Sequence, residues 1–191
     1  MRRTLLVGLG LIVVGVLAIF LDSWFGLDLE PVALFGIVVG AVLALVPDGT
    51  PFMRLTGFAG GVVVTWVAYF LRAGVLPDTP GGRAVALGLV IALATGIAAV
   101  SFGRIPLWST LLGAAALAGA YEFTFADSPP EVATTSVIAA TSLLFTAALG
   151  FLVAAVFAPA GEEPPEPRES HPPRSDDEET HSLDDMMEES K

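Results

Sequence analysis

The chain contains no cysteine, and its only two histidines, His171 and His181, lie close to the C-terminal end. Without cysteine there is no disulfide, no thiolate nucleophile and no cysteine metal site. Because the rest of the chain also lacks histidine, it lacks the commonest metal ligand and the commonest general base. These absences predict no catalytic residue, no metal site and no cofactor.

Sequence motifs of enzymes are missing as well. Gly8-Leu9-Gly10 lies inside an apolar run with no strand before it, and no phosphate-binding loop is present. No aspartate falls within an apolar segment, so the chain cannot form an intramembrane aspartyl pair. The glycine and phosphate motifs need a defined strand or loop context that this sequence does not provide. We therefore predict that the protein is not an enzyme.

Apolar residues, by contrast, make up 54% of the 191 residues, and the mean hydropathy is +0.74. This is well above the composition of an ordinary soluble domain. A helix needs about 20 residues to cross about 30 Å of hydrocarbon, and only helices or closed barrels satisfy their backbone groups there. Six apolar segments approach that length, at 4–21, 31–46, 57–76, 84–102, 107–126 and 135–158. The predicted fold class is an all-α membrane protein, a bundle of about six transmembrane helices within residues 1–158.

Short turn-forming stretches separate the segments, for example Pro47-Asp48-Gly49-Thr50-Pro51. Neighbouring helices should therefore be antiparallel hairpins. The N-terminal Met1-Arg2-Arg3 before an apolar run is also compatible with a signal peptide or a twin-arginine signal. The long run and the absence of a small-residue cleavage site at Phe20-Leu21-Asp22 favour a transmembrane helix instead.

The orientation follows from basic residues near the segment ends. In a six-helix arrangement four arginines share the side of the N-terminus and two lie opposite; the four are Arg2, Arg3, Arg54 and Arg104, and the two are Arg72 and Arg83. This distribution predicts a multi-pass protein of the cell membrane with both termini cytoplasmic.

Two kinds of pattern suggest how the helices pack. Small residues recur at four-residue spacing, as in Gly36 and Gly40 or Gly57 and Gly61, which allows close helix contact. Packing within one chain is the simpler interpretation, and a homo-oligomer interface is the alternative. A short similarity, 32–36 against 85–88, would make the second and third helices a duplicate of the fourth and fifth.

Arg72 and Glu122 are the ionisable residues well inside apolar segments, and charge in such positions is unfavourable unless it is paired. Both lie about six residues beyond the middle of helices that run in the same direction, so both reach a similar depth and could pair. One hypothesis is a substrate or ion site. The alternatives are a structural ion pair, or side chains that reach separately to the outer interface.

The C-terminal segment 159–191 has 12 acidic side chains against three basic ones, a net charge of −9. Its proline-rich, charged composition predicts a disordered, acidic cytoplasmic tail. Near its end, Leu183, Met186 and Met187 would share one face of a short helix, which could dock on a basic protein partner. A tail without a partner is the alternative. Its negative charge argues against nucleic acid and anionic lipid head groups.

Two functions remain after these exclusions. The first is a non-enzymatic structural or accessory protein whose lipid-embedded bundle presents the acidic tail to a cytoplasmic partner. The alternative is a small transporter or channel subunit that uses Glu122 and Arg72. In that case a polar path would include the hydroxyl residues of the second half, Thr95, Ser101, Ser109, Thr110, Thr134, Thr135, Ser136, Thr141, Ser142 and Thr146.

Overall fold

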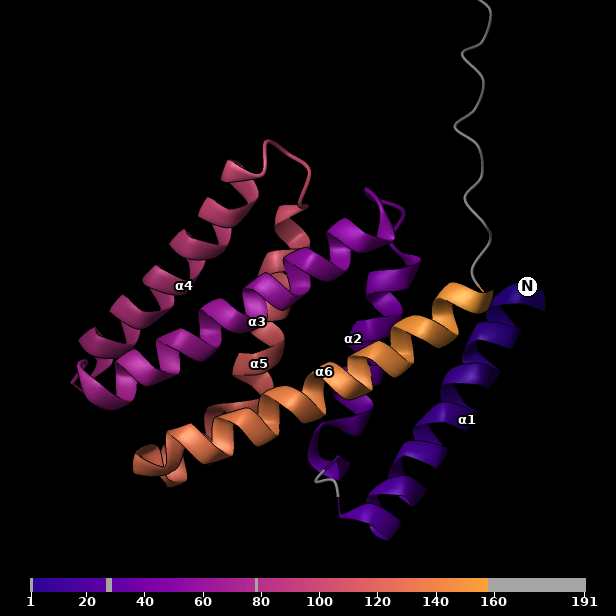
Figure 1. The fold of residues 1–191 in the computed structure, drawn as a ribbon, viewed down its shortest axis with the longest axis horizontal. Helices are drawn as coiled ribbons and strands as arrows, with labels where there is room; N and C mark the ends of the chain where they lie inside the picture. Colours follow the sequence, from indigo (N-terminus) through magenta and orange to yellow (C-terminus); the bar gives the residue numbers. More distant parts are fainter. Residues whose placement is uncertain (1, 27–28, 78, 158–191) are drawn as a thin grey trace, which may run out of the picture. The chain divides into compact units, whose positions relative to one another are not determined.

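The structure is a computed structural model, and it describes residues 2–26, 29–77 and 79–157. These residues form six α-helices joined by short loops (Figure 1). The helices are α1 (Arg2–Phe25), α2 (Glu30–Leu45), α3 (Pro51–Gly74), α4 (Pro80–Val100), α5 (Leu107–Asp127) and α6 (Val132–Phe157), with a 3-10 turn η1 (Pro129–Glu131) before α6. The predicted all-α fold is confirmed for these residues. The predicted tail contacts, Leu183, Met186 and Met187, lie outside the described residues.

Four helical stretches are long and apolar enough to cross a membrane, namely Thr4–Phe25, Pro51–Gly74, Pro80–Val100 and Pro129–Phe157. Large apolar side chains cover their outer faces; Leu5 is 73% exposed and Leu87 is 62% exposed. Such a continuous apolar surface is unfavourable in water and suits a lipid environment. By helix length and hydropathy the chain is a multi-pass membrane protein. The short α2 and the more polar α5 do not meet the same measure.

Capping residues explain why two helices begin before the predicted apolar segments. α3 begins at Pro51 rather than near residue 57, because the Thr50 hydroxyl accepts a hydrogen bond from the Met53 N–H at 3.3 Å. α4 likewise begins at Pro80, where the Thr79 hydroxyl accepts from the Gly82 N–H at 3.2 Å. A threonine N-cap followed by proline at the first helical position satisfies free N–H groups without needing apolar residues.

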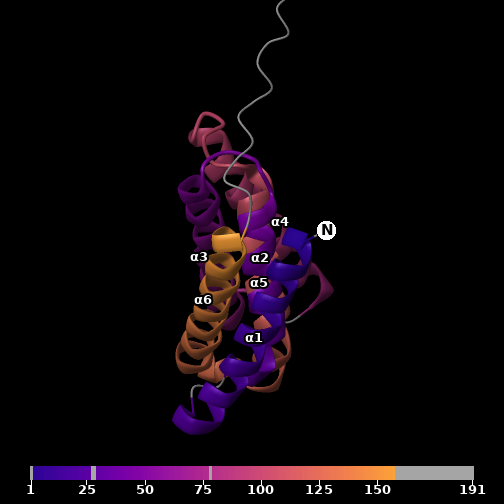
Figure 2. The ribbon, with the colours of Figure 1, turned by 90° about the vertical axis from the view of Figure 1, so that its right-hand side faces the viewer.

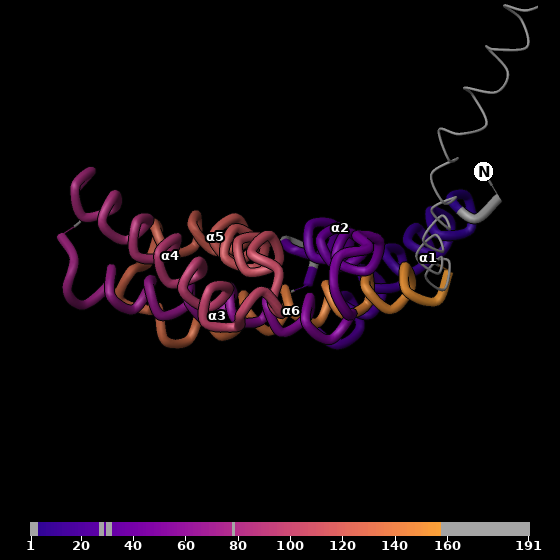
Figure 3. The backbone as a smooth tube through the Cα atoms, turned by 90° about the horizontal axis from the view of Figure 1, so that it is seen from above, coloured from indigo at the N-terminus to yellow at the C-terminus, as the bar shows by residue number. Residues whose placement is uncertain are grey.

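The helices form two halves that are built alike: one half consists of α1, α2 and α6, and the other of α3, α4 and α5. α2 packs mainly on α6, and α3 packs mainly on α5, while α1 lies against α2 and α6 and α4 lies against α3 and α5. Figure 3 shows α1 and α4 at opposite ends, with the other four helices between them. A half-turn about the line of sight of Figure 1 carries α1, α2 and α3 onto α4, α5 and α6 in chain order and direction. The fold therefore has an internal pseudo-two-fold axis.

Glycines at the two main helix crossings give residue-level evidence for this symmetry. A Cβ on Gly40 would collide with the Ala147 carbonyl, and in the other half a Cβ on Gly113 would collide with the Phe58 carbonyl. The collisions that follow three residues later on the partner helix also match: Gly150 meets the Ile37 carbonyl, and Gly61 meets the Thr110 carbonyl. One correspondence, α2 to α5 and α6 to α3, accounts for both crossings with identical spacing.

This symmetry corrects the register of the repeat predicted from sequence. The similarity of 32–36 to 85–88 pairs α2 with α4, but α2 packs chiefly on α6 whereas α4 packs on α3 and α5. The matched letters are common apolar residues, and their agreement does not follow the helix packing. Two glycines of α4, Gly88 and Gly96, also have no neighbouring atom within 4 Å of an added Cβ. They therefore do not mark a helix contact inside this chain.

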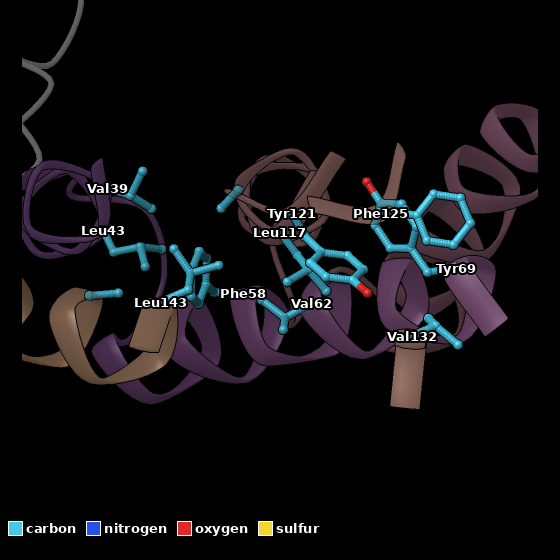
Figure 4. Packing of buried hydrophobic residues seen from close by; sticks show 12 residues of the cluster. Val39, Leu43, Phe58, Val62, Tyr69, Leu117, Tyr121, Phe125, Val132 and Leu143 are labelled. Atoms are coloured by element: carbon cyan, nitrogen blue, oxygen red, sulfur yellow. The ribbon is translucent and has the colours of Figure 1, made fainter. Parts of the chain in front are cut away.

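The core lies where α3, α5 and α6 meet. Leu117, Tyr121 and Leu143 are fully buried and pack with Phe58 and Tyr69 (Figure 4). The Tyr121 hydroxyl forms a 2.6 Å hydrogen bond with the Thr135 hydroxyl, so its polar atom is satisfied inside this apolar cluster. α5 thus lies at the centre of the packing, which gives its polar residues partners within the protein.

Candidate functional site

Arg72 of α3 and Glu122 of α5 form a salt bridge. Arg72 Nη1 donates to Glu122 Oε2 at 2.8 Å and to Oε1 at 3.1 Å. The Tyr69 hydroxyl donates to the same Oε2 at 2.7 Å. The structure therefore brings together the two residues that the sequence singled out, and it adds a tyrosine one helical turn before Arg72.

Aromatic rings hold the arginine in place. The Arg72 guanidinium carbon lies 4.6 Å from the centre of the Phe125 ring and 5.5 Å from that of Tyr69. A cation over the face of an aromatic ring is stabilised electrostatically, and more strongly where water is excluded. The Arg72 side chain is only 15% exposed, whereas that of Glu122 is 49% exposed. The carboxylate is thus the more accessible member of the pair.

A pocket of about 440 Å³ begins at this pair and lies between α3, α4 and α5. Its polar end contains Tyr69, Arg72, Glu122 and Arg83, and Arg83 also interacts electrostatically with Glu122. The remaining walls are almost entirely apolar, formed by Thr65, Ala68, Ala86, Leu87, Val90, Ile91, Leu111, Ala114, Ala115 and Ala118. A mostly apolar pocket with a few convergent polar groups is the usual form of a small-molecule site.

In the other half, side chains fill part of the equivalent place. By the correspondence at the crossings, Ala41 and Ala154 match Ala114 and Thr65, which line the pocket. Ala41 and Ala154 are instead covered by Val7 of α1, with Leu11 packed beside it. Figure 2 shows α1 lying along this side of α6. A second pocket of about 410 Å³ nevertheless lies between α1 and α2, with Leu11 in its wall, and its described lining residues are all apolar. The two halves therefore differ in the polar end of the pocket, and not in whether a pocket is present.

Most of the predicted hydroxyl path is occupied by local hydrogen bonds. Ser109 donates to the Pro106 carbonyl at 2.8 Å, Thr110 to Leu107 at 2.8 Å and Thr146 to Ser142 at 2.8 Å. Hydroxyls in apolar helices commonly bond backbone carbonyls one turn earlier. Thr65 is the hydroxyl residue that lines the pocket, and its own bond reaches the Ala114 carbonyl of α5 at 3.2 Å.

Arg54 is a second buried cation, and it caps the C-terminal end of α2. Arg54 is 6% exposed, and its Nη1 donates to the carbonyls of Leu43 at 2.8 Å, Ala44 at 3.1 Å and Val46. These carbonyls lie at the C-terminal end of α2, where the helix itself supplies no N–H donor. The helix dipole also favours a positive charge there. Arg54 Nε has no hydrogen-bond partner among the described residues. Sequence reasoning treated Arg54 only as a topology marker.

The described part of the chain contains no group of three histidine, aspartate or glutamate residues that could hold a metal ion. Comparisons with protein-family models, curated proteins and solved structures found no match.

Sequence reasoning identified Arg72 and Glu122 but missed Tyr69, Phe125 and Arg83 as their neighbours. A helical spacing could have suggested Tyr69, because it lies three residues before Arg72 and so shares its helix face. Arg83 is different, since only the folded loop between α3 and α4 brings it to the same pocket.

Proposed function

We propose that the protein is a non-enzymatic carrier in which all six helices cross the membrane and the pocket between α3, α4 and α5 binds the solute. The observation that carries this proposal is the asymmetry between the halves: the pocket beside α4 ends at Arg72, Glu122 and Tyr69, whereas the described lining residues of the pocket beside α1 are all apolar.

The pseudo-two-fold symmetry supports the same proposal. Each repeat, α1–α3 or α4–α6, has three helices, so six crossings give the repeats opposite orientations in the membrane, as in carriers built from inverted repeats. Such carriers expose one site alternately to the two sides as one part of the bundle moves against the other. In this chain the half that contains α4 and the half that contains α1 would exchange their packing. Both termini then lie in the cytoplasm, and the pocket opens at the outer side in the state described.

An accessory protein without transport is the competing function, with the acidic tail as its cytoplasmic contact surface. The local hydrogen bonds of the α5 and α6 hydroxyls and the aromatic packing of Arg72 are compatible with it. The two functions differ in whether the pocket is static. A static pocket is reached by an aqueous reagent from one side at most, whereas a carrier's pocket is reached from both.

The absence of cysteine makes this difference directly measurable. We expect Ala118→Cys, in the pocket wall, to react with a membrane-impermeant maleimide added to either side of sealed vesicles. The matched control Ala92→Cys, on the exposed face of α4 outside the pocket, should react from neither side because it faces lipid. Reaction of Ala118→Cys from one side only would reject the carrier and favour the accessory role.

A further inference from the structure

The accessible group at the polar end of the pocket is a hydrogen-bond acceptor. Glu122 lines the pocket, and its side chain is 49% exposed, compared with 15% for Arg72. An ionised carboxylate has about four acceptor positions, two on each oxygen. Within the described residues Oε2 accepts from Arg72 and Tyr69, whereas Oε1 accepts from Arg72 alone. Glu122 Oε1 therefore keeps a position for a donor from a ligand.

The charges around this carboxylate favour a head group without net charge. Arg72 and Glu122 neutralise each other across a 2.8 Å contact, and the Arg72 guanidinium also lies over the Phe125 ring. Arg83 interacts with Glu122 and has a further interaction partner, so it is not a free positive charge for an anion. An anionic head group would meet the exposed carboxylate, and a cationic one would meet two guanidinium groups. Like charges at close range are unfavourable, most of all where water is scarce.

The apolar part of the pocket constrains the rest of the ligand. Along α5 the lining extends from Glu122 to Leu111, which is about 16 Å of helix. Over this length the walls are alanine and aliphatic side chains apart from Thr65, whose hydroxyl already donates to the Ala114 carbonyl. A compact polar solute would leave this length unmatched and would lose its hydration there. An alkyl chain fits it.

The wall formed by α4 also allows entry from the bilayer. Leu87 and Ile91 line the pocket, yet they are 62% and 48% exposed on the surface that faces lipid. Arg72 is two residues from the end of α3, so the polar end of the pocket lies near the end of that helix. A molecule already dissolved in the membrane could therefore slide its chain past α4 while its head group stays at the polar end.

We propose that this pocket binds a neutral single-chain amphiphile with a hydroxyl head group, the hydroxyl donating to Glu122 and the alkyl chain lying along α5 toward Leu111. A long-chain primary alcohol and a monoacylglycerol share this chemistry. The inference rests on the proposed carrier function for the role of the pocket. Binding is measured at equilibrium without transport, whereas the carrier is tested by accessibility from two sides, so either can fail alone.

The test uses the full chain in phosphatidylcholine nanodiscs, with empty nanodiscs to subtract partition into lipid. The probes are dodecanol, monododecanoylglycerol, dodecyl methyl ether, and dodecanoate and dodecylammonium in their charged forms. We expect saturable binding of dodecanol, about tenfold tighter than that of the ether, which has no donor, or of either ion. The tighter of dodecanol and monododecanoylglycerol identifies the source of the hydroxyl. Tightest binding of dodecanoate or of dodecylammonium would overturn the inference in favour of an anion or a cation site.

Substitutions of the carboxylate test the donor contact. Glu122→Leu removes the acceptor and should weaken dodecanol binding about tenfold, as expected for loss of a hydrogen bond to a charged group. Glu122→Gln keeps a carbonyl acceptor and should restore part of the affinity. Binding of dodecyl methyl ether should be the same in all three proteins, because the ether cannot donate.

The ether separates a lost contact from a disturbed pocket. If Glu122→Leu does not fold, Glu122→Gln alone must still weaken dodecanol binding more than ether binding. Unchanged dodecanol affinity in the substituted proteins, or an equal loss for dodecanol and the ether, would show that the hydroxyl does not contact Glu122.

Substitutions in the apolar wall test the position of the chain. Ala118→Leu should abolish saturable dodecanol binding, and Ala92→Leu should leave it unchanged, since only Ala118 lines the pocket. If Ala118→Leu unfolds, as judged by circular dichroism, Ala115→Leu serves the same purpose from an exposed lining position. Non-saturable uptake of every probe, unchanged by these substitutions, would show that no site exists.

Discussion

At the level of single residues, charge inside the bundle is retained only where other groups compensate for it. Arg72 has a carboxylate partner and two aromatic faces, and Arg54 has three carbonyls at a helix end. Both solutions replace the water that lipid excludes. Loss of either arginine should lower the free energy of unfolding by a different amount. Glu122, the partner of Arg72, is half exposed, whereas the carbonyls bound by Arg54 are not.

For the ion pair, removing one partner should be worse than removing both. Glu122→Gln alone and Arg72→Leu alone should each lower the free energy of unfolding by about 1–3 kcal/mol, because an unpaired charge remains near the lipid. The exposure of Glu122 places its own change near the lower limit. The double variant should recover part of the loss, which a double-mutant cycle in detergent measures. Losses that simply add would show that the contact contributes no coupling energy.

Replacement of Arg54 should lower the free energy of unfolding more than replacement of an exposed arginine. Arg54→Leu should lower the free energy of unfolding by about 2–4 kcal/mol, since it leaves buried carbonyls without a donor. Arg104→Leu is the matched control, because Arg104 is exposed in the loop before α5. Arg54→Lys should recover part of the loss by keeping one donor and the charge. Equal thermal stability of the Arg54→Leu and Arg104→Leu variants would contradict the capping role.

At the level of helices, each half is held together by one crossing with close backbone contact, α2 with α6 or α3 with α5. At Gly113 and Gly150 the partner carbonyl occupies the space that a Cβ would need, so the helices approach more closely than side chains allow. Lipid provides no hydrophobic force between helices, and close backbone packing therefore becomes a main source of association.

Alanine at these positions should separate the helices. Gly113→Ala and Gly150→Ala should each lower thermal stability, by about 1–3 kcal/mol, because the opposing atom is rigid backbone. Gly88→Ala and Gly96→Ala are matched controls in α4 with open space around the added methyl, and they should be neutral or slightly stabilising, by less than about 1 kcal/mol. If the crossing and control glycines behave alike, the close contacts do not determine stability.

The sequence predicted the presence of the helices, but not the first residues of α3 and α4 or the repeat. Hydrophobic length identified all six helices, because in lipid the apolar run and the helix nearly coincide. It misplaced the beginnings of α3 and α4, where Thr50 and Thr79 add a polar first turn. The three-helix repeat was missed because the halves are matched by backbone crossings. Those crossings constrain only a few small residues, whereas most apolar positions accept several side chains.

At the level of the whole molecule, the sequence predicted the charged pair of the candidate site but not the pocket beside it. Counting residues along each apolar segment placed Arg72 and Glu122 at a similar depth, and so predicted that they could pair. The pocket beside them could not be predicted, because it depends on how α3, α4 and α5 pack against one another.

The symmetry also makes a strict prediction about α2. Its 16 residues span only about 24 Å, less than the roughly 30 Å of hydrocarbon. Its partner in the other half, α5, has 21 residues. If the repeats α1–α3 and α4–α6 are inverted copies, α2 must nevertheless cross, with local thinning of the bilayer at its ends. Arg54 supports this, because its Nη1 satisfies two carbonyls of the last turn of α2 without water.

Reporter fusions test that crossing. Fusions in the loops at Asp48 and Arg104 should behave as cytoplasmic, and fusions at Asp78 and Asp127 as external, because six crossings alternate from a cytoplasmic N-terminus. A fusion at residue 191 should also be cytoplasmic. If α2 turned back without crossing, the Asp48 fusion would be external and every later loop would change sides. The repeats α1–α3 and α4–α6 would then have the same orientation, and alternating access between inverted repeats would be ruled out.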